Sequence, residues 1–360
     1  MSRPPNLESL MSLQDTIVWA ANAYGIGSTL VGATAFIGFD EQKDHFDNYF
    51  FCDGVADDVE TQAAVDYVEA LGGGRVCVDK GLYYYADTVD VKHTYIHGSG
   101  MTWHGQNRGT CIGTTADIAG KPVFSFDEVD RIHFAGIYDL TIYNQHGLDS
   151  IYIKSLADAH FERLYLNQGG QHGINVEGTE FDMWNLWIED CLFENLTNHG
   201  IRIDQADHDI IKTHILNNYF FNNELGINIQ QFLEEGGTAE YIDIIGNHFF
   251  TMAKNCIQLW KNCYNIKIVN NSIFRPSDET NDTSNGIRVG DGDVDGDKCQ
   301  WIEIRGNRID GDNRAKYGVS LEDSTDRILV LGNSINQCVT ATYNAEVGVT
   351  NVLKDNNIEV

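Results

Sequence analysis

Positive charge is scarce in this sequence. Lysine and arginine together number 24, against 53 aspartates and glutamates, which gives a formal net charge of -29. A surface of that sign repels the phosphate backbone of DNA and RNA, so nucleic acid is excluded as a partner. The same charge disfavours a polyanionic sugar unless calcium or a local basic patch intervenes.

Long apolar runs are also missing. The longest apolar stretch, residues 25–39, is rich in glycine and too short to cross a bilayer, so we expect no membrane insertion. Residues 1–20 hold no apolar core that leads to a small-residue cleavage site, so we expect no signal peptide. These absences predict a soluble protein that, if it acts outside a cell, leaves by another route such as lysis.

Paired cysteines and prolines are rare too. The eight cysteines are scattered without a CxxC pair, so we expect them to be buried as small apolar side chains. Four prolines interrupt the chain, whereas 35 glycines supply turns and apolar residues make up 42%. This composition suits a folded chain with a continuous core.

Residues 49–100 predict a short helix followed by strands. Residues 53–58, with the sequence DGVADD, are typical of a turn. Apolar residues then recur at helical spacing up to Leu71. Asp57 or Asp58 is the expected N-cap, and three glycines at 72–74 end the helix. Extended stretches are predicted at 75–78, 82–91 and 96–100.

The order of these elements resembles the start of a known superfamily. DGVADD, an amphipathic helix, GGGRVCV, a turn glycine, YYY and IHGSG follow one another as in pectate-lyase-like proteins, especially the branch of phage tailspikes and family 28 glycosidases. Lys80 stands where a proline is expected before the turn glycine. The resemblance implies an all-β fold, a single-stranded right-handed parallel β-helix with a short N-terminal capping helix. It also implies that catalytic groups lie further along the coils.

Internal repeats extend this interpretation to the rest of the chain. One strand pattern begins seven times, at intervals of 23, 27, 26, 30, 30 and 32 residues, from Ser150 through Gly173, Gly200, Gly226, Cys256 and Gly286 to Gly318. Each coil thus consists of a core of similar length in every repeat and a loop whose length varies. Alternation places Ile174, Val176, Ile201 and Ile203 inside. The sequence predicts an attachment or oligomerisation segment at 1–48, a capping helix and entrance at 49–100, and coils at 101–360.

A second strand pattern precedes a column of asparagines. The same slot of successive coils holds Asn218, Asn247, Asn271, Asn307, Asn333 and, by extension, Asn356. Asparagine tolerates left-handed backbone and its amide can bond the next coil, so we expect a structural ladder at a sharp turn. These asparagines are not catalytic candidates.

Two carboxylates are the strongest catalytic candidates. Glu177 and Asp204 share an outward column on consecutive coils, about 4.8 Å apart, with Arg202 beside them. Such a pair suits the acid and nucleophile of a retaining glycosidase, roughly 5 Å apart, or with other rotamers the wider inverting gap. Tyr152 and Trp260 are candidate substrate contacts on the same face, since an aromatic ring can stack on a sugar. Alternatively, chance alone pairs two carboxylates on so acidic a surface.

Two other patterns offer weaker candidates. His214 and Asp243 could form an acid–base pair, although a surface row of ion pairs is the favoured interpretation, since their predicted column also holds Trp187, Lys267 and Glu303. The tripeptides QHG at 171–173 and NHG at 198–200 resemble the histidine-glycine motif of family 28 glycosidases. That family's companion motifs do not occur in this sequence, so its catalytic residues are not transferred.

One acidic loop has the spacing of a calcium site. Asp291, Asp293 and Asp295 match the DxDxDG pattern, in which alternating oxygens converge on one ion. The twelfth position is Ile302 instead of glutamate, so the EF-hand pattern is incomplete. Calcium is therefore one interpretation and an exposed acidic loop is the other, and no cofactor is required.

Function at this stage depends on the resemblance and on the layout of the chain. The superfamily hosts lyases, hydrolases, epimerases and adhesins, so the fold does not decide between them. Three features favour a virion protein: no visible signal peptide, a first segment that matches neither cap nor coil, and a chain that stops at Val360 directly after a coil. An uncovered last coil would expose strand edges, which a trimer or a neighbour in a particle would cover.

The expected function is accordingly that of a tailspike. We expect a phage or virus tailspike-like protein that binds, and in one interpretation cleaves, host surface polysaccharide. It would assemble in the host cytoplasm as a homotrimer with other virion proteins and act outside the cell. The alternatives are a free polysaccharide lyase or glycoside hydrolase, and a purely structural virion decoration.

Overall fold

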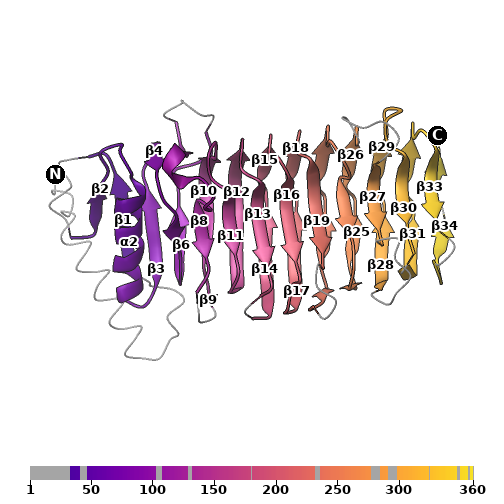
Figure 1. Cartoon of the computed structure of the whole chain (residues 1–360), viewed down its shortest axis with the longest axis horizontal. Coiled ribbons are helices and arrows are strands. Elements are labelled where there is room, and N and C mark those ends of the chain that lie inside the picture. The colour runs from indigo at the N-terminus through magenta and orange to yellow at the C-terminus, as the bar shows by residue number, and fades with distance from the viewer. Residues whose placement is uncertain are drawn as a thin grey trace, which may run out of the picture.

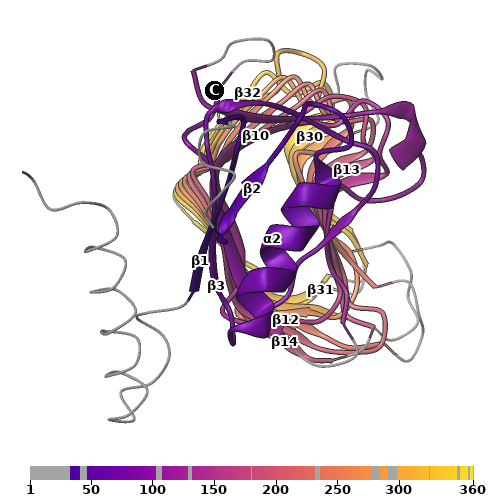
Figure 2. The ribbon, with the colours of Figure 1, turned by 90° about the vertical axis from the view of Figure 1, so that its left-hand side faces the viewer.

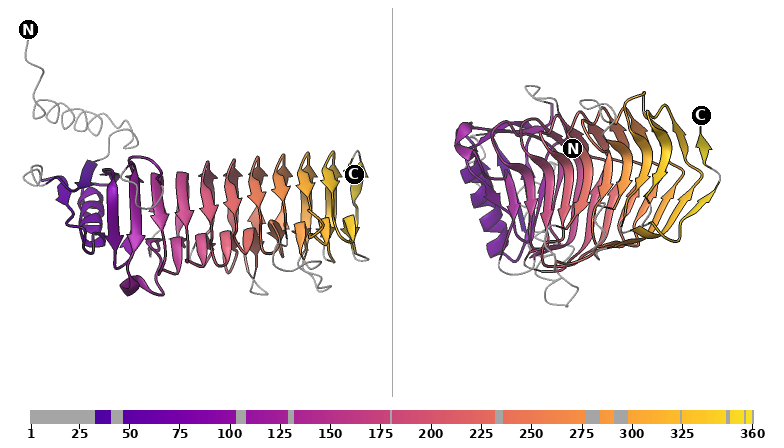
Figure 3. Two further views of the ribbon diagram at one scale, coloured as in Figure 1. Left: turned by 90° about the horizontal axis from the view of Figure 1, so that it is seen from above. Right: turned by 45° about the vertical axis from the view of Figure 1, so that its right-hand side comes forward.

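Parallel strands stack coil upon coil along one axis in the computed structural model, which forms a β-solenoid of about nine turns (Figures 1 and 3). The right-handed parallel β-helix predicted from the repeats is confirmed. The structure describes residues 33–40, 47–102, 108–128, 132–179, 181–231, 236–276, 284–290, 298–323, 325–346, 349–355 and 357–359.

One face of the solenoid is a ten-stranded parallel sheet, here called sheet B. Its strands are β5 (Val89–Asp90), β8 (Phe124–Phe126), β11 (Asp149–Ile153), β13 (His172–Glu177), β16 (His199–Asp204), β19 (Leu225–Gln230), β23 (Ile257–Leu259), β27 (Asn285–Val289), β30 (Tyr317–Leu321) and β33 (Ala341–Ala345). The register pairs Ile174 with Ile201 and Ile201 with Ile227. The strand repeat read from the sequence is therefore the register of sheet B.

The remaining faces belong to a 25-stranded sheet, here called sheet A. Its long strands bend from one face to the next, because the first half of β12 pairs with β14 and its second half with β15. Its strands are β1 (Ala33–Gly38), β2 (Tyr49–Phe51), β3 (Gly74–Val78), β4 (Gly81–Tyr85), β6 (Thr94–His97), β7 (Thr110–Thr114), β9 (Ile132–His133), β10 (Gly136–Tyr143), β12 (Leu156–Asn167), β14 (Met183–Glu189), β15 (Leu192–Glu194), β17 (Ile210–Leu216), β18 (Tyr219–Phe221), β20 (Ala239–Glu240), β21 (Asp243–Ile245), β22 (His248–Phe250), β24 (Cys263–Tyr264), β25 (Lys267–Val269), β26 (Ser272–Phe274), β28 (Cys299–Arg305), β29 (Arg308–Asp310), β31 (Thr325–Leu331), β32 (Ser334–Asn336), β34 (Leu353–Asp355) and β35 (Ile358–Glu359).

Helix α2 (Asp58–Ala70) lies across the N-terminal end of the solenoid (Figure 2). It packs Ala64, Val65 and Val68 against the first coils, and its N-cap is Asp57, one of the two residues that the sequence predicted. The Asp57 carboxylate accepts hydrogen bonds from the backbone N–H groups of Gly54 and Tyr84, so it ties the preceding turn to the second coil. A short 3₁₀ turn, η2 (Ala116–Ile118), is the other helical element of the described residues.

The first coil begins before residue 49. Strand β1 pairs in parallel with β3, so the solenoid includes residues that the sequence assigned to an attachment segment. Residues 1–32 lie outside the described part of the chain. Among the described residues, no helix has the length and apolar character needed to cross a bilayer.

The interior is a continuous apolar core with stacked aromatic rings. Ile174, Val176, Ile201 and Ile203 are fully buried, as alternation predicted. Phe220 stacks on Phe193 and Phe249 with ring centroids 4.8 and 4.7 Å apart. Gly200 is the first residue of one strand repeat. A Cβ added there would lie 2.5 Å from the Phe220 ring, so only glycine fits beside the aromatic stack.

The asparagine column is a buried ladder of amides. The Oδ1 atom of Asn271 accepts from the backbone N–H and the amide of Asn247, and its own amide donates to Ile244 O and Asn307 Oδ1, all within 2.9 to 3.1 Å. Left-handed backbone occurs one position earlier, for example at Asn270 (φ 55°). The ladder ends at Asn357, which accepts from Asn333, so Asn356 was the wrong extension.

Candidate functional site

Polar side chains line the outer surface of sheet B. The register confirms that the predicted column continues without a break, from Tyr152 through Asn175, Arg202, Asn228, Gln258, Arg288 and Ser320 to Asn344. A parallel column, two residues on, pairs Glu177 with Asp204 and Asp204 with Gln230. Many of these polar groups are nearly inaccessible: Asn228 is 2% exposed and Gln258 5%. The positions of the polar groups on this surface are therefore fixed by hydrogen bonds between neighbouring side chains.

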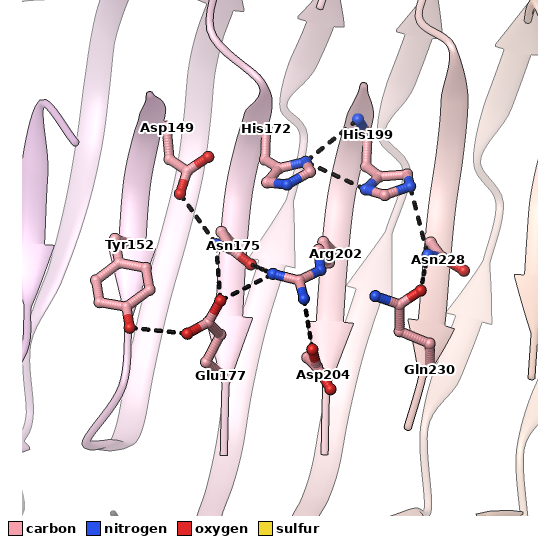
Figure 4. Close-up of polar contacts among 10 residues, drawn as sticks. All are labelled: Asp149, Tyr152, His172, Asn175, Glu177, His199, Arg202, Asp204, Asn228 and Gln230. Atoms are coloured by element: carbon pink, nitrogen blue, oxygen red, sulfur yellow. Dashed lines mark hydrogen bonds and ion pairs between the residues drawn. The ribbon is translucent and has the colours of Figure 1, made fainter. Parts of the chain in front are cut away.

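Arg202 bridges the two candidate carboxylates (Figure 4). Its Nη1 lies 2.8 Å from Oε1 of Glu177 and 3.1 Å from Oδ1 of Asn175, and its Nη2 contacts Oδ2 of Asp204. The side chains of Arg202 and Asp204 are 15% and 7% exposed, and that of Glu177 is 27% exposed. The structure thus brings together the three residues predicted as catalytic, with Glu177 the most accessible of them.

Tyr152 completes this cluster from the preceding coil. Its hydroxyl donates to Oε2 of Glu177 at 2.9 Å, so the two oxygens of that carboxylate are bound by different residues. Burial, followed by the nearby Glu177 charge, raises the pKa of Tyr152, so the phenol keeps its proton. Tyr152 therefore orients Glu177 as a hydrogen-bond donor.

Asp149 lies behind the cluster and was missed by the sequence reasoning. Its Oδ2 accepts from the amide of Asn175 at 2.9 Å, and that amide is also 3.4 Å from Oε1 of Glu177. Burial raises the pKa of Asp149 to about 6. Asp149 is in register with His172, three residues before Tyr152 and Asn175, so strict alternation from the outward columns does not place it on this face.

Two histidines stack beside Arg202 at the start of β13 and β16. The rings of His172 and His199 are 4.8 Å apart and nearly parallel, with their Nδ1 atoms 3.1 Å apart, and the amide of Asn228 lies 3.4 Å from Nε2 of His199. Burial lowers the pKa of His172 to about 3 and that of His199 to about 2. Both rings are neutral near pH 7, so they act here as hydrogen-bonding spacers. They are the histidines of the QHG and NHG tripeptides.

Trp260 lies with a different group of residues. It directly follows β23, two coils beyond the Asp204 strand, and the guanidinium carbon of Arg288 lies 5.7 Å from its ring centroid. The structure thus places Trp260 two coils beyond Asp204, as the repeat predicted, with Arg288 beside its ring. Asp291, Asp293 and Asp295, the predicted calcium ligands, lie outside the described residues.

The second candidate column forms a row of ion pairs on sheet A. Nδ1 of His214 lies 3.1 Å from Oδ2 of Asp243, whose Oδ1 is 3.3 Å from Nζ of Lys267. The Trp187 ring stacks on His214 at 4.0 Å. These contacts match the ion-pair alternative stated for this column.

Two groups of possible metal ligands occur among the described residues, both outside sheet B. In the first, Cys52, Asp57 and Glu60, burial raises the pKa of the Cys52 thiol, which disfavours the thiolate that a metal needs. In the second, Nε2 of His160 already pairs with Glu189 at 2.6 Å, and Glu162 is paired with Arg163. In the second group, two of the three candidate ligands therefore bond each other and the third bonds an arginine.

The comparison with known proteins shows the fold. No family model matches the chain, and no curated protein matches it. A mutant tailspike protein of E. coli bacteriophage HK620 in complex with a pentasaccharide has a TM-score of 0.61 at 12% identity, over 85% of this chain and 63% of that one. Geobacillus virus E2 ORF18 has a TM-score of 0.54 at 16% identity, over 100% of this chain and 64% of that one. The A-module of the mannuronan C-5 epimerase AlgE6 of Azotobacter vinelandii has a TM-score of 0.50 at 17% identity, over 86% and 96%.

These neighbours are pectate-lyase-like β-helix proteins, as the resemblance implied. The chain spans less than two thirds of the length of the two viral structures. At such low identity the likeness shows a shared fold, and the site has to be argued from its own residues.

Proposed function

We propose that this chain is a tailspike-like virion protein whose sheet B binds a host surface polysaccharide. The observation that carries the proposal is the ordered polar surface of sheet B, where hydroxyl, amide, guanidinium and carboxylate groups are already held in place by one another. Sugar hydroxyl groups need donors and acceptors in fixed positions, and groups fixed before binding lose little entropy when the ligand arrives. Two viral proteins with this fold, one of them bound to a pentasaccharide, support a virion setting.

Cleavage is the finer part of the proposal, and it assigns the chemistry to Glu177 and Asp204. Their strands are adjacent, which puts their backbones about 4.8 Å apart, so the two carboxyl groups can reach the separation of roughly 5 Å that retaining glycosidases need. Arg202 contacts both carboxylates, so this contact does not by itself distinguish an acid from a base. The division into acid and base would therefore depend on the substrate, which displaces water and contacts the more accessible Glu177.

Binding and turnover of capsule or lipopolysaccharide glycans by the wild type and by the Glu177→Gln and Asp204→Asn variants test the proposal. We expect the wild type to bind at least one glycan. If it is also an enzyme, each variant should lose about 100- to 10,000-fold in turnover with little change in affinity or melting temperature. Glu303→Gln on sheet A is the matched control, because the Glu303 side chain is 26% exposed and also pairs with an arginine.

Each other outcome points to a different function. Binding without turnover leaves an adhesive tailspike, and turnover that survives both substitutions moves the chemistry to other residues, with His214 and Asp243 next to be tested. Turnover by a protein that does not associate with virions supports a free polysaccharide lyase or hydrolase. A virion protein that binds none of the glycans is a structural decoration, and the proposal is then wrong.

We also propose a homotrimer, supported by an exposed aromatic patch on sheet A. Tyr219, Phe221 and Phe250 are 54%, 39% and 41% exposed, and with Leu192 and His248 they line a shallow hollow. Exposed apolar patches rimmed by polar residues commonly mark protein contacts. Sedimentation should give three times the 40.3 kDa of one chain, and Phe221→Ser with Phe250→Ser should dissociate the assembly. A single-chain mass for the wild type would contradict the trimer.

A further inference from the structure

A polar hollow lies on sheet B, near its C-terminal coils. It has a volume of about 280 Å³ and is lined by side chains from β27, β30 and β33, from residues next to β30 and β33, and from the turn before β23: Asn255, Asn285, Arg288, Lys316, Tyr317, Ser320, Glu322, Asn344 and Glu346. None of these residues belongs to the cluster around Glu177. The hollow is therefore a separate site on the same face.

The hollow is built around a bidentate ion pair. Nε and Nη2 of Arg288 donate to the two oxygens of Glu322 at 2.7 and 2.5 Å, and the guanidinium group also lies beside Trp260. The Arg288 and Glu322 side chains are 25% and 13% exposed, so both are held in place but reachable. On the next coil the amide of Asn344 donates to the Ser320 hydroxyl at 3.3 Å. These groups form an ordered set of donors and acceptors beside one aromatic ring.

The hollow is lined by equal numbers of positive and negative side chains. Arg288 and Lys316 supply two cations, and Glu322 and Glu346 supply two anions, on a chain whose net charge is -29. A polyanionic sugar would gain little from this balanced lining and would be repelled by the rest of the surface. Hydroxyl groups, by contrast, both donate and accept hydrogen bonds, so they can bond amides, carboxylates and guanidinium groups alike. The lining fits a neutral glycan.

The two sites lie on one unbroken column of strand positions on sheet B. Arg202 and Arg288 share one column and are separated by three strand spacings, with Asn228 and Gln258 between them. At about 4.8 Å for each spacing, the two arginines are about 14 Å apart along the axis. That is the length of a short oligosaccharide and exceeds a single sugar ring. One glycan chain lying along the axis could contact both sites.

We propose that the Arg288 hollow is a second sugar subsite, and that the protein binds a neutral polysaccharide which runs along sheet B and contacts both clusters. This inference rests on the proposed function. It adds the charge class of the glycan, its direction on the surface and a minimum length. The Arg288 subsite anchors the chain while Glu177 and Asp204 contact another part of it.

A length series of oligosaccharides from the bound polysaccharide tests the inference, with the wild type and an Arg288→Met/Glu322→Leu double variant. The double variant removes both charges of the pair, so no unpaired charge is left buried. For the wild type, we expect the affinity to rise by at least 10-fold once the oligosaccharide is long enough to reach both clusters. The double variant should lose that gain and still bind short oligosaccharides as the wild type does. Its melting temperature is checked in parallel.

The outcomes separate this inference from the function on which it rests. If the wild type binds no glycan, both fail. If it binds but the double variant has the same affinity at every length, the second subsite is wrong and the proposed function stands. If only acidic polysaccharides bind, the charge class is wrong. Should the double variant fail to fold, Lys316→Gln with Asn344→Ala on the neighbouring coils repeats the test, and an unchanged length dependence again contradicts the inference.

Discussion

Replacing Arg202 by methionine should destabilise the protein far more than removing a surface cation. Methionine keeps an unbranched apolar chain of similar reach but leaves Glu177 and Asp204 without their shared counter-charge. Because the Asp204 side chain is only 7% exposed, water cannot replace the lost contacts. Removing one partner of a buried ion pair costs about 3–5 kcal/mol, and we expect Arg202→Met to fall in this range.

Urea unfolding, followed by circular dichroism, measures this cost. Lys254→Met is the control, because Lys254 pairs with Glu224 and its side chain is 54% exposed, so its loss should cost less than about 1 kcal/mol. The deficit of Arg202→Met should shrink toward about pH 4, where carboxylates begin to take up protons and no longer need a counter-charge. Adding Asp204→Asn to Arg202→Met should restore part of the stability. An Arg202→Met variant as stable as Lys254→Met would refute this account of the cluster.

Two further predictions concern the ladder and the histidine stack. Asn271→Ala should cost about 3 kcal/mol in the free energy of unfolding, because it leaves buried partners unpaired, whereas Gln145→Ala, which breaks two long, exposed hydrogen bonds, should cost less than about 1 kcal/mol in the same urea titration. The folded state keeps His172 and His199 neutral, so their contribution is complete above the unfolded pKa of about 6.5 and is lost as the pH falls toward about 3. Asp149, with its pKa raised to about 6, opposes this between about pH 4 and 6, so melting temperatures should fall on acidification by less than two histidines alone would give. A melting temperature that rises on acidification below pH 6 would contradict the sign.

The sequence predicts the coils well because residues at the same position of the sequence repeat are paired between neighbouring coils of sheet B. Each strand of sheet B must place its apolar residues on those of the neighbouring coil, so a shift by one residue would turn the core outward. The sequence repeat alone also predicts that Glu177 lies beside Asp204, and the strand register confirms it. The backbone of the turn is predicted less accurately. The asparagine pattern locates the turn, but the left-handed residue is Asn270 and not the ladder residue that follows it.

Side-chain directions and depth could not be read from the columns. The repeat places Trp260 two coils beyond Asp204, but it does not show that the Trp260 ring lies beside the Arg288 guanidinium group, because that contact depends on the side-chain direction after the end of β23. Asp149 was overlooked because its importance arises from burial, which raises its pKa, and periodicity does not report burial on an outer surface. The hollow around Arg288 likewise depends on turns between strands, whose conformations have no period.

Carbodiimide labelling of carboxylates with and without the bound polysaccharide tests the central claim most directly. Glu177 on sheet B and Glu303 on sheet A have side chains 27% and 26% exposed, so they should react at comparable rates in the free protein. If the glycan lies on sheet B, saturating polysaccharide should slow the labelling of Glu177 several-fold and leave Glu303 unchanged. Tight binding of the polysaccharide with Glu177 still labelled at its free rate would contradict the claim that sheet B is the binding surface.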